Sequence, residues 1–188
     1  DVHKLCEEYI RGRFDELPKE LREFEEAFVK LKELHELGQV TCESDWAITK
    51  DWDQTGWFDN DTWGRAKVDA FVYDEGNSKE ARVIDFKTGR YEGNQEAHKE
   101  QCELYGGIAL KRYPELEKII TEMWYLDHGK IDRYIYTQES INIKRDKIHI
   151  RAVEMTEATE FPANPSKWKC KWCYFGKQNM CREKYEEF

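Results

Sequence analysis

The chain lacks a long hydrophobic run, an excess of positive charge and any repeated or low-complexity segment. No apolar stretch approaches the ~18 residues that a membrane span needs, and no secretory signal is visible, so we expect a cytoplasmic protein with no membrane partner. Thirty basic residues against 39 acidic ones give a formal net charge of −9. The surface as a whole therefore gives no indication of nucleic-acid binding.

The chain also lacks the cysteine pattern of a disulfide framework. Three of its six cysteines lie close together near the end and three are scattered, namely Cys170, Cys173 and Cys181 against Cys6, Cys42 and Cys102. A reducing cytoplasm suits free thiols and metal thiolates better than disulfide bridges.

What the chain does contain is enough for one folded domain, predicted to span residues 1–188. Aromatic residues make up 14% of it, including seven tryptophans, which argues against disorder. The chain begins at Asp1 rather than at methionine, so we expect it to be a fragment whose beginning is missing.

Two apolar, β-prone runs each contain one acidic residue. Asp69 lies between Val68 and Ala70 in residues 66–72, and Asp85 lies within residues 82–89. Burying a carboxylate costs several kcal/mol unless it is paired or bound to a metal. The two acids therefore predict a site rather than ordinary strand positions.

The polar link between these runs, residues 73–80, predicts a hairpin turn. Neighbouring strands would then bring Asp69 and Asp85 side by side. Lys87, two residues after Asp85, would share their face because strand side chains repeat every second residue. Two acids and a lysine on one sheet face favour a metal-dependent hydrolytic site.

Asp69, together with the D-x-K-T-G run that begins at Asp85, resembles the core of the PD-(D/E)XK nuclease superfamily, specifically its RecB-like exonuclease branch. In that branch a helix with a Q-x-x-x-Y motif follows, and here Gln101 and Tyr105 match it. Ala66 stands where a glycine is usual, which is a mild departure. A lone D-x-K motif is weak evidence, whereas the ordered set is specific.

The resemblance covers about residues 1–181 and implies an α/β fold. We expect a central mixed β-sheet flanked by helices, with a restriction-endonuclease-like core. Hydrophobic periodicity predicts helices over residues 2–14, 19–38, 95–111 and 139–156, and strands over residues 40–49, 66–72, 82–89, 119–126 and 131–137.

The resemblance also implies a metal site. Asp69 and Asp85, with His3 or Glu43, would hold one or two Mg²⁺ or Mn²⁺ ions, and the backbone carbonyl of Phe86 would complete the shell. Two alternatives stay open. The histidine could be a surface residue that pairs with Glu7, which we expect to be a solvated helix residue, and Glu43 could be an exposed strand acid.

Three further residues receive catalytic roles from the resemblance. Lys87 would position the attacking water or neutralise developing negative charge. Gln101 would hold a water or a phosphate, and the hydroxyl of Tyr105 would orient a neighbour. The alternative for these last two is an ordinary packed helix with a polar rim.

The late cysteines Cys170, Cys173 and Cys181 resemble the C-terminal cluster of iron–sulfur members of this branch, in a segment spanning residues 161–188. Cys6 is the only early candidate for a fourth ligand, and it does not match the family position. By residue type, thiolates suit a [4Fe–4S] cluster or zinc, of which the resemblance favours the cluster. The alternative is three reduced thiols without a ligand.

The function implied is that of a metal-dependent DNA nuclease, an exonuclease acting on single strands or duplex ends in a prokaryotic or phage-infected cell. One rival is an inactive nucleic-acid-binding module of the same fold, and another is a structural zinc protein. The presence of Asp69, Asp85 and Lys87 together argues against both. Active-site residues alone do not reveal whether a DNA end is required.

Overall fold

The computed structural model describes residues 1–185 of the chain. It forms two compact units, Asp1–His149 and Ile150–Phe188, whose boundary lies within helix α4 (Gln138–Glu157). The cysteine segment predicted for residues 161–188 lies in the second unit. That the whole chain acts as one domain stays a prediction.

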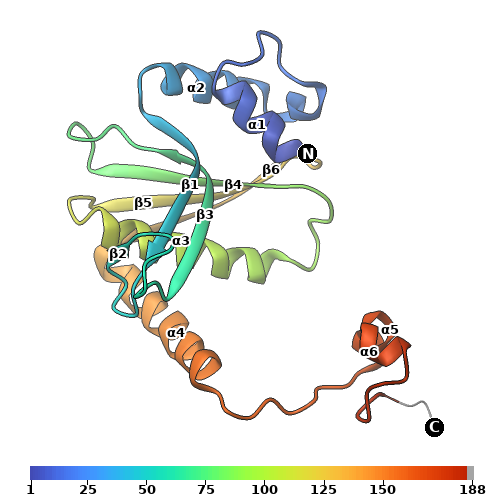
Figure 1. Ribbon diagram of the computed structural model, residues 1–188. Coiled ribbons are helices and arrows are strands. Elements are labelled where there is room, and N and C mark those ends of the chain that lie inside the picture. Colours follow the sequence, from blue (N-terminus) through green and yellow to red (C-terminus); the bar gives the residue numbers. More distant parts are fainter. Residues whose placement is uncertain (186–188) are drawn as a thin grey trace. The chain divides into compact units, whose positions relative to one another are not determined.

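The first unit is built on one six-stranded sheet (Figure 1). Its strands are β1 (Val40–Ile48), β2 (Gln54–Thr55), β3 (Gly64–Val72), β4 (Glu80–Lys87), β5 (Lys118–Tyr125) and β6 (Lys130–Thr137). They lie in the order β2-β1-β3-β4-β5-β6, and only the β4–β5 pair is parallel. The predicted α/β class with a mixed sheet and flanking helices is confirmed.

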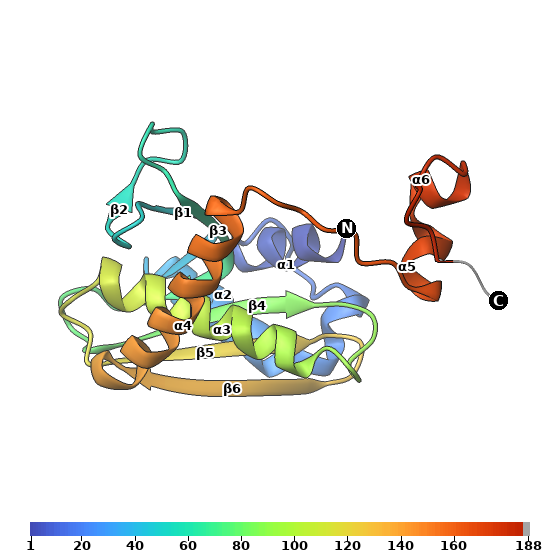
Figure 2. The ribbon, with the colours of Figure 1, turned by 90° about the horizontal axis from the view of Figure 1, so that it is seen from below.

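Helices cover both faces of this sheet and create two hydrophobic cores. They are α1 (Val2–Ile10), the 3-10 helix η1 (Lys19–Phe24), α2 (Glu25–Glu36) and α3 (Gln95–Arg112). In β4, Val83 faces the core beneath α3, whereas Ile84 and Phe86 face the core beneath α1 and α2. Figures 1 and 2 show α3 on the side of the sheet opposite to α1 and α2. A central strand covered on both sides needs apolar residues at successive positions, as β4 has.

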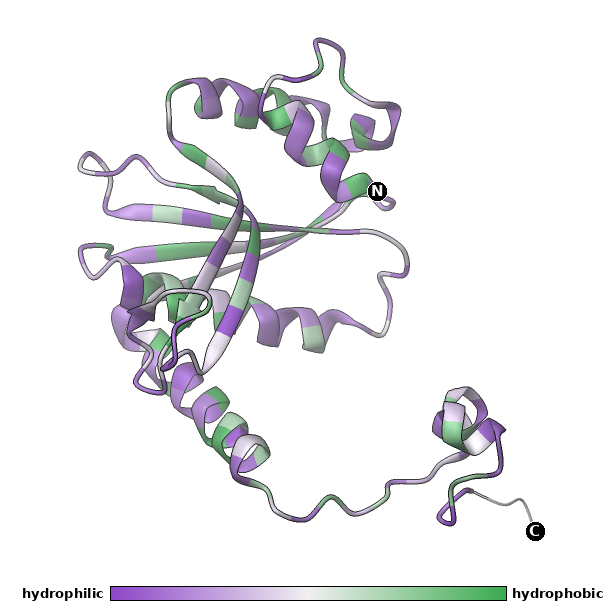
Figure 3. Ribbon diagram, viewed as in Figure 1, coloured by the Kyte–Doolittle hydropathy of each residue, from purple (hydrophilic) through white to green (hydrophobic). Residues whose placement is uncertain are grey.

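The helix predicted over residues 19–38 is wrong in its first part, which is the separate 3-10 helix η1. Leu21 and Phe24 are both buried and three residues apart, which suits the three-residue repeat of a 3-10 turn. The predicted helix 2–14 is also too long, because Gly12 adopts a φ of 73° and the helix ends before it. Figure 3 shows hydrophobic and hydrophilic residues alternating along α1 and α2, as amphipathic helices require.

Strand β3 leaves β4 part-way along its length, which opens a fork in the sheet. It pairs with β4 only over residues 70–72, whereas it pairs with β1 on both sides of Asp69, over residues 64–68 and 70–72. Asp69 is the first residue of β3 beyond the shared pairing. The facing residue of β1, Glu43, has a φ of 54°, which is uncommon for a residue other than glycine. The fork therefore exposes polar groups at a point where a regular sheet would pair them.

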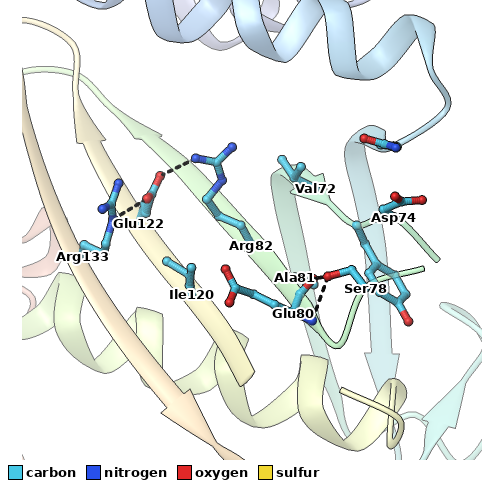
Figure 4. Close-up of a pocket in the computed structure, with 11 residues that line it drawn as sticks. Val72, Asp74, Ser78, Glu80, Ala81, Arg82, Ile120, Glu122 and Arg133 are labelled. Carbon is cyan, nitrogen blue, oxygen red and sulfur yellow. Dashed lines mark hydrogen bonds and ion pairs between the residues drawn. The ribbon is translucent and has the colours of Figure 1, made fainter. Parts of the chain in front are cut away.

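On the neighbouring strand β5, where it pairs with Ile84, Glu122 is buried with its charge compensated (Figure 4). Its Oε1 accepts a hydrogen bond of 2.7 Å from Arg133 Nε, its Oε2 accepts one of 2.8 Å from Trp124 Nε1, and Arg82 Nη1 lies 3.7 Å away. Arg82, Glu122 and Arg133 border a cavity of about 390 Å³. Because the two guanidinium groups already satisfy the carboxylate, this cluster is a structural charge network.

The second unit contains the end of α4 and two short helices, α5 (Lys167–Trp172) and α6 (Tyr174–Lys177). Across residues 1–185, no helix combines the length and the apolar character needed to cross a membrane.

We predict that Phe28→Ala lowers the free energy of unfolding by about 3–5 kcal/mol. The Phe28 side chain is fully buried and its ring contacts those of Tyr9, Phe86 and Trp124. Urea denaturation followed by circular dichroism measures the change. Phe58→Ala is the matched control, because Phe58 is 86% exposed and should cost less than about 1 kcal/mol. Equal losses in the two variants would contradict the assigned core.

Candidate active site

Asp69 and Asp85 lie side by side where β3 meets β4. Ala70 pairs with Ile84, so the two acids occupy the next facing positions along the two strands. Asp85 is only 4% exposed, and the Asp69 side chain is 14% exposed. Asp69 Oδ2 accepts a hydrogen bond of 2.7 Å from the backbone N–H of Phe86. The side-by-side placement predicted from the hairpin is thus present.

Helix α3 holds Asp85 from above the strand. Asp85 Oδ1 accepts a hydrogen bond of 3.0 Å from Gln101 Nε2 and lies 2.9 Å from the Tyr105 hydroxyl. Gln101 and Tyr105 are four residues apart, so they share the helix face that looks onto the site. The Tyr105 hydroxyl also lies 3.0 Å from the carbonyl of Lys67, which ties α3 to the diverging part of β3.

Lys87 completes this network on the same face of β4. Its Nζ lies 2.5 Å from Asp85 Oδ2 and donates a hydrogen bond of 3.0 Å to Gln101 Oε1. The Oδ2 atom of Asp85 is buried, and this ion pair is its contact with the ammonium group. Gln101 and Tyr105 therefore hold Asp85 through its Oδ1 atom, while its Oδ2 atom faces the ammonium group of the flexible Lys87 side chain.

His3 approaches the site from the first turn of α1. Its Nε2 lies 2.7 Å from the carbonyl oxygen of Phe86 and 3.8 Å from Asp69 Oδ2. The helix starts at this point because the Asp1 side chain accepts a hydrogen bond of 3.1 Å from the backbone N–H of His3. The structure thus brings together the residues named from the resemblance, and their roles stay predictions.

An open cleft of about 460 Å³ adjoins Asp69. Its lining consists of Asp1, His3, Lys4, Glu7, Glu43 and Asp69. Glu43 lies beside the site rather than at its centre, with its Oε2 3.5 Å from Lys67 Nζ. Sequence reasoning placed Glu7 in solvent, yet it borders this cleft while pairing with Arg11 at 2.9 Å. The signal that could have found it is its position one helical turn after His3.

The surroundings of Asp69 oppose its ionisation. Burial first, and then the neighbouring carboxylate of Asp85, raise the pKa of Asp69 to about 6. Burial and the same carboxylate raise the pKa of the Tyr105 hydroxyl, so it stays protonated and can donate. The site is therefore poised for a compensating positive charge.

The comparisons with known proteins bear on this arrangement. The sequence profile of the PD-(D/E)XK nuclease superfamily matches residues 1–182. The chain belongs to the PD-(D/E)XK nuclease superfamily. Membership implies a nucleic-acid substrate, and the superfamily typically uses divalent metal ions. Among curated proteins, none matches the sequence significantly.

Two solved structures give an independent view of the fold. The chain is 13% identical to a protein described as "Putative exonuclease" from Eubacterium rectale, with a TM-score of 0.51, over 99% of this chain and 76% of that one. It is 16% identical to a protein designated SSO0001, with a TM-score of 0.37, over 98% of both chains. The first of these likenesses supports the superfamily fold.

The residues of this site fit the divalent ion that the superfamily uses. Asp85 Oδ2 is a buried oxygen that accepts no hydrogen bond, and carboxylate, carbonyl and imidazole groups are donors suited to Mg²⁺ or Mn²⁺. As they stand, no three His, Cys, Asp or Glu side chains of residues 1–185 form a ready cluster. An ion here would require a rotation of Asp85 or Lys87 and would draw on the Phe86 carbonyl.

The three late cysteines belong to the second unit. All three are free thiols, with Cys173 exposed and Cys170 and Cys181 partly exposed. Cys170 Sγ accepts a hydrogen bond of 3.4 Å from the backbone N–H of Tyr185. The early candidate Cys6 is fully buried in the core under α1, where burial raises the pKa of its thiol. A shared cluster of the four stays a prediction.

We predict that Asp69→Asn stabilises the metal-free protein at pH 8 but not at pH 4. The pKa of Asp69 is about 6 when folded and near 3.9 when unfolded, so the folded state binds the proton more tightly. This tighter proton binding stabilises the folded state by roughly 2–3 kcal/mol below about pH 4. The stabilisation is lost as the pH rises to about 6. The Asp69→Asn substitution removes the carboxylate charge, so the variant does not lose this stability as the pH rises.

Melting temperatures measured in EDTA at both pH values test this. The variant should melt roughly 5–10 °C above the parent at pH 8 and level with it at pH 4. Asp15→Asn, at an exposed position, is the control and should show no difference. A lower melting temperature for Asp69→Asn at pH 8 would disprove the assigned electrostatics.

Proposed function

We propose that the protein is a metal-dependent DNA nuclease of the RecB-like branch that removes nucleotides from DNA ends. The observation that carries the proposal is the convergence of Asp69, Asp85 and Lys87 at the fork between β3 and β4. Phosphodiester hydrolysis needs a polarised phosphate, an activated water and stabilisation of the leaving oxygen. Acids that hold a cation, beside a fixed ammonium group, meet those needs.

Each residue of the site has a separate task in this proposal. Asp69 and Asp85, with His3 and the Phe86 carbonyl, would hold the ion. Bound there, Mg²⁺ or Mn²⁺ would supply Lewis-acid polarisation of the phosphate and lower the pKa of an attacking water. Lys87 would turn from Asp85 toward the phosphate and neutralise the charge that develops on it.

Helix α3 supports these residues without taking part in the bond changes. Gln101 donates to Asp85 and accepts from Lys87, so it fixes the distance between the acid and the ammonium group. Tyr105 holds the second lone pair of the same Asp85 oxygen from a buried position. Such preorganisation keeps both groups aimed at the reacting phosphate.

Two observations support exonuclease over endonuclease activity. The order of motifs along the chain is that of RecB-like exonucleases, and the Eubacterium rectale structure is described as a "Putative exonuclease". We also propose that Cys170, Cys173 and Cys181 bind a [4Fe–4S] cluster, with a fourth ligand still to be identified. The spacing of these thiols suits zinc as a second choice.

We predict that Asp85→Ala abolishes cleavage and weakens divalent-ion binding. Lys87→Ala should keep ion binding and lower kcat by about 10²–10³-fold, because it removes only the stabilising charge. Cleavage of labelled DNA gives kcat, and the rise in melting temperature with Mg²⁺ or Mn²⁺ reports ion binding. Lys30→Ala is the control, at an exposed position of α2 paired with Glu33. Unchanged cleavage by Asp85→Ala would reject the proposal.

We predict that end-labelled linear DNA is degraded in Mn²⁺ while a covalently closed circle of the same sequence survives. The products should be short from the earliest times, because an exonuclease releases them from the end. Gel electrophoresis of both substrates over a time course, with and without the ion, is the measurement. Opening of the closed circle would show an endonuclease instead.

A further inference from the structure

The second unit carries a concentration of positive charge and exposed aromatic surface that is unlike the rest of this acidic chain. Residues 167–177 include four lysines and no acid. Within this stretch Trp168 and Trp172 are each 70% exposed. Exposed indoles among lysines are costly to leave in water and mark a binding surface.

Helix geometry divides α5 into two sides. Trp168 and Trp172 are four residues apart, so they lie on one face. Cys170 lies two residues from each, about 160–200° around the helix, and therefore points to the other side. A metal bound by the cysteines would leave the indole face free.

Contacts within the second unit agree with this division. Helix α6 packs against the backbone of Cys170, where a Cβ on Gly176 would lie only 2.8 Å from the Cys170 carbonyl oxygen. The chain also returns to this side, since the backbone N–H of Tyr185 reaches Cys170 Sγ. The unit thus packs onto the cysteine side of α5.

The lysines lie against the indole rings. Lys171 Nζ is 5.8 Å from the centre of the Trp168 ring and 5.4 Å from that of Trp172, and Lys177 Nζ is 5.3 Å from the Trp172 ring. Cation–π contacts of this kind keep the amines beside the rings. Rings that can stack bases and amines that can pair with phosphates therefore lie next to one another.

We propose that the surface made by Trp168, Lys169, Lys171 and Trp172 of α5 and by Lys177 of α6 binds single-stranded DNA by stacking bases on the two indoles and pairing phosphates with the lysines. Single strands fit because only unstacked bases can cover an indole ring. Four lysines without an acid complement the phosphates, which the acidic remainder of the chain cannot do. The inference rests on the proposed nuclease function and assigns the strand-holding role to the second unit.

The test is binding of fluorescein-labelled dT20 to the full chain carrying Asp85→Asn, so that cleavage does not intervene. Adding Trp168→Ala and Trp172→Ala should raise the Kd about 30-fold, whereas replacing both by phenylalanine should restore it to within about 3-fold. Lys169→Gln with Lys171→Gln should reduce the slope of log K against log salt by about 1.4. Phe58→Ala and Lys30→Gln are the matched controls and should change neither quantity.

Three results would overturn the inference. The first is an unchanged Kd in the double alanine variant. The second is a fall in melting temperature as large as that of Phe28→Ala, which would mean that the indoles pack inside the protein. The third is stronger binding to anionic phosphatidylserine vesicles than to dT20. DNA cleavage by the parent chain, together with an unchanged Kd in the double alanine variant, would reject this inference alone. Tryptophan-dependent binding, together with no cleavage by the parent chain, would reject only the nuclease proposal.

Discussion

The repulsion between two buried carboxylates is the constraint on which the rest of the first unit depends. Asp69 and Asp85 face each other at adjacent strand positions, in surroundings that raise the pKa of Asp69 to about 6. Neither would be stable there without positive charge or donated hydrogen bonds. The backbone N–H of Phe86 serves one acid, and Lys87 with Gln101 serves the other. In the proposed function, a divalent ion would satisfy both acids at once.

Helix α3 links the pair of acids to the rest of the sheet. It connects the parallel strands β4 and β5 and packs closely enough on the sheet that a Cβ on Gly106 or Gly107 would approach a neighbouring ring to 3.0 Å. That close approach lets Gln101 and Tyr105 reach Asp85. On the opposite face, α1 brings His3 to the Phe86 carbonyl. Helices on both faces of the sheet therefore place side chains beside the same pair of acids.

The sequence allowed the sheet and the central site to be predicted because the relevant signals are local. A hairpin turn fixes the register of Asp69 against Asp85, and a two-residue repeat places Lys87. Glu7 was missed because its role depends on how α1 docks against β1, which no local pattern encodes. The 3-10 turn was missed because Leu21 and Phe24 fit a helical repeat as well as a three-residue one. The fourth cysteine ligand depends on contacts between distant segments and stays open for the same reason.

The proposed division of labour between the two units rests on their charges. The first holds the acids that a cation requires, and the second carries lysines and indoles in a stretch without acids. The most direct test of the central claim is a crystal of the protein soaked in Mn²⁺, with anomalous diffraction recorded at the manganese edge. The account predicts a peak within coordination distance of Asp69, Asp85 and the Phe86 carbonyl, with Lys87 moved away from Asp85. A peak elsewhere, with the Lys87–Asp85 pair intact, would contradict it.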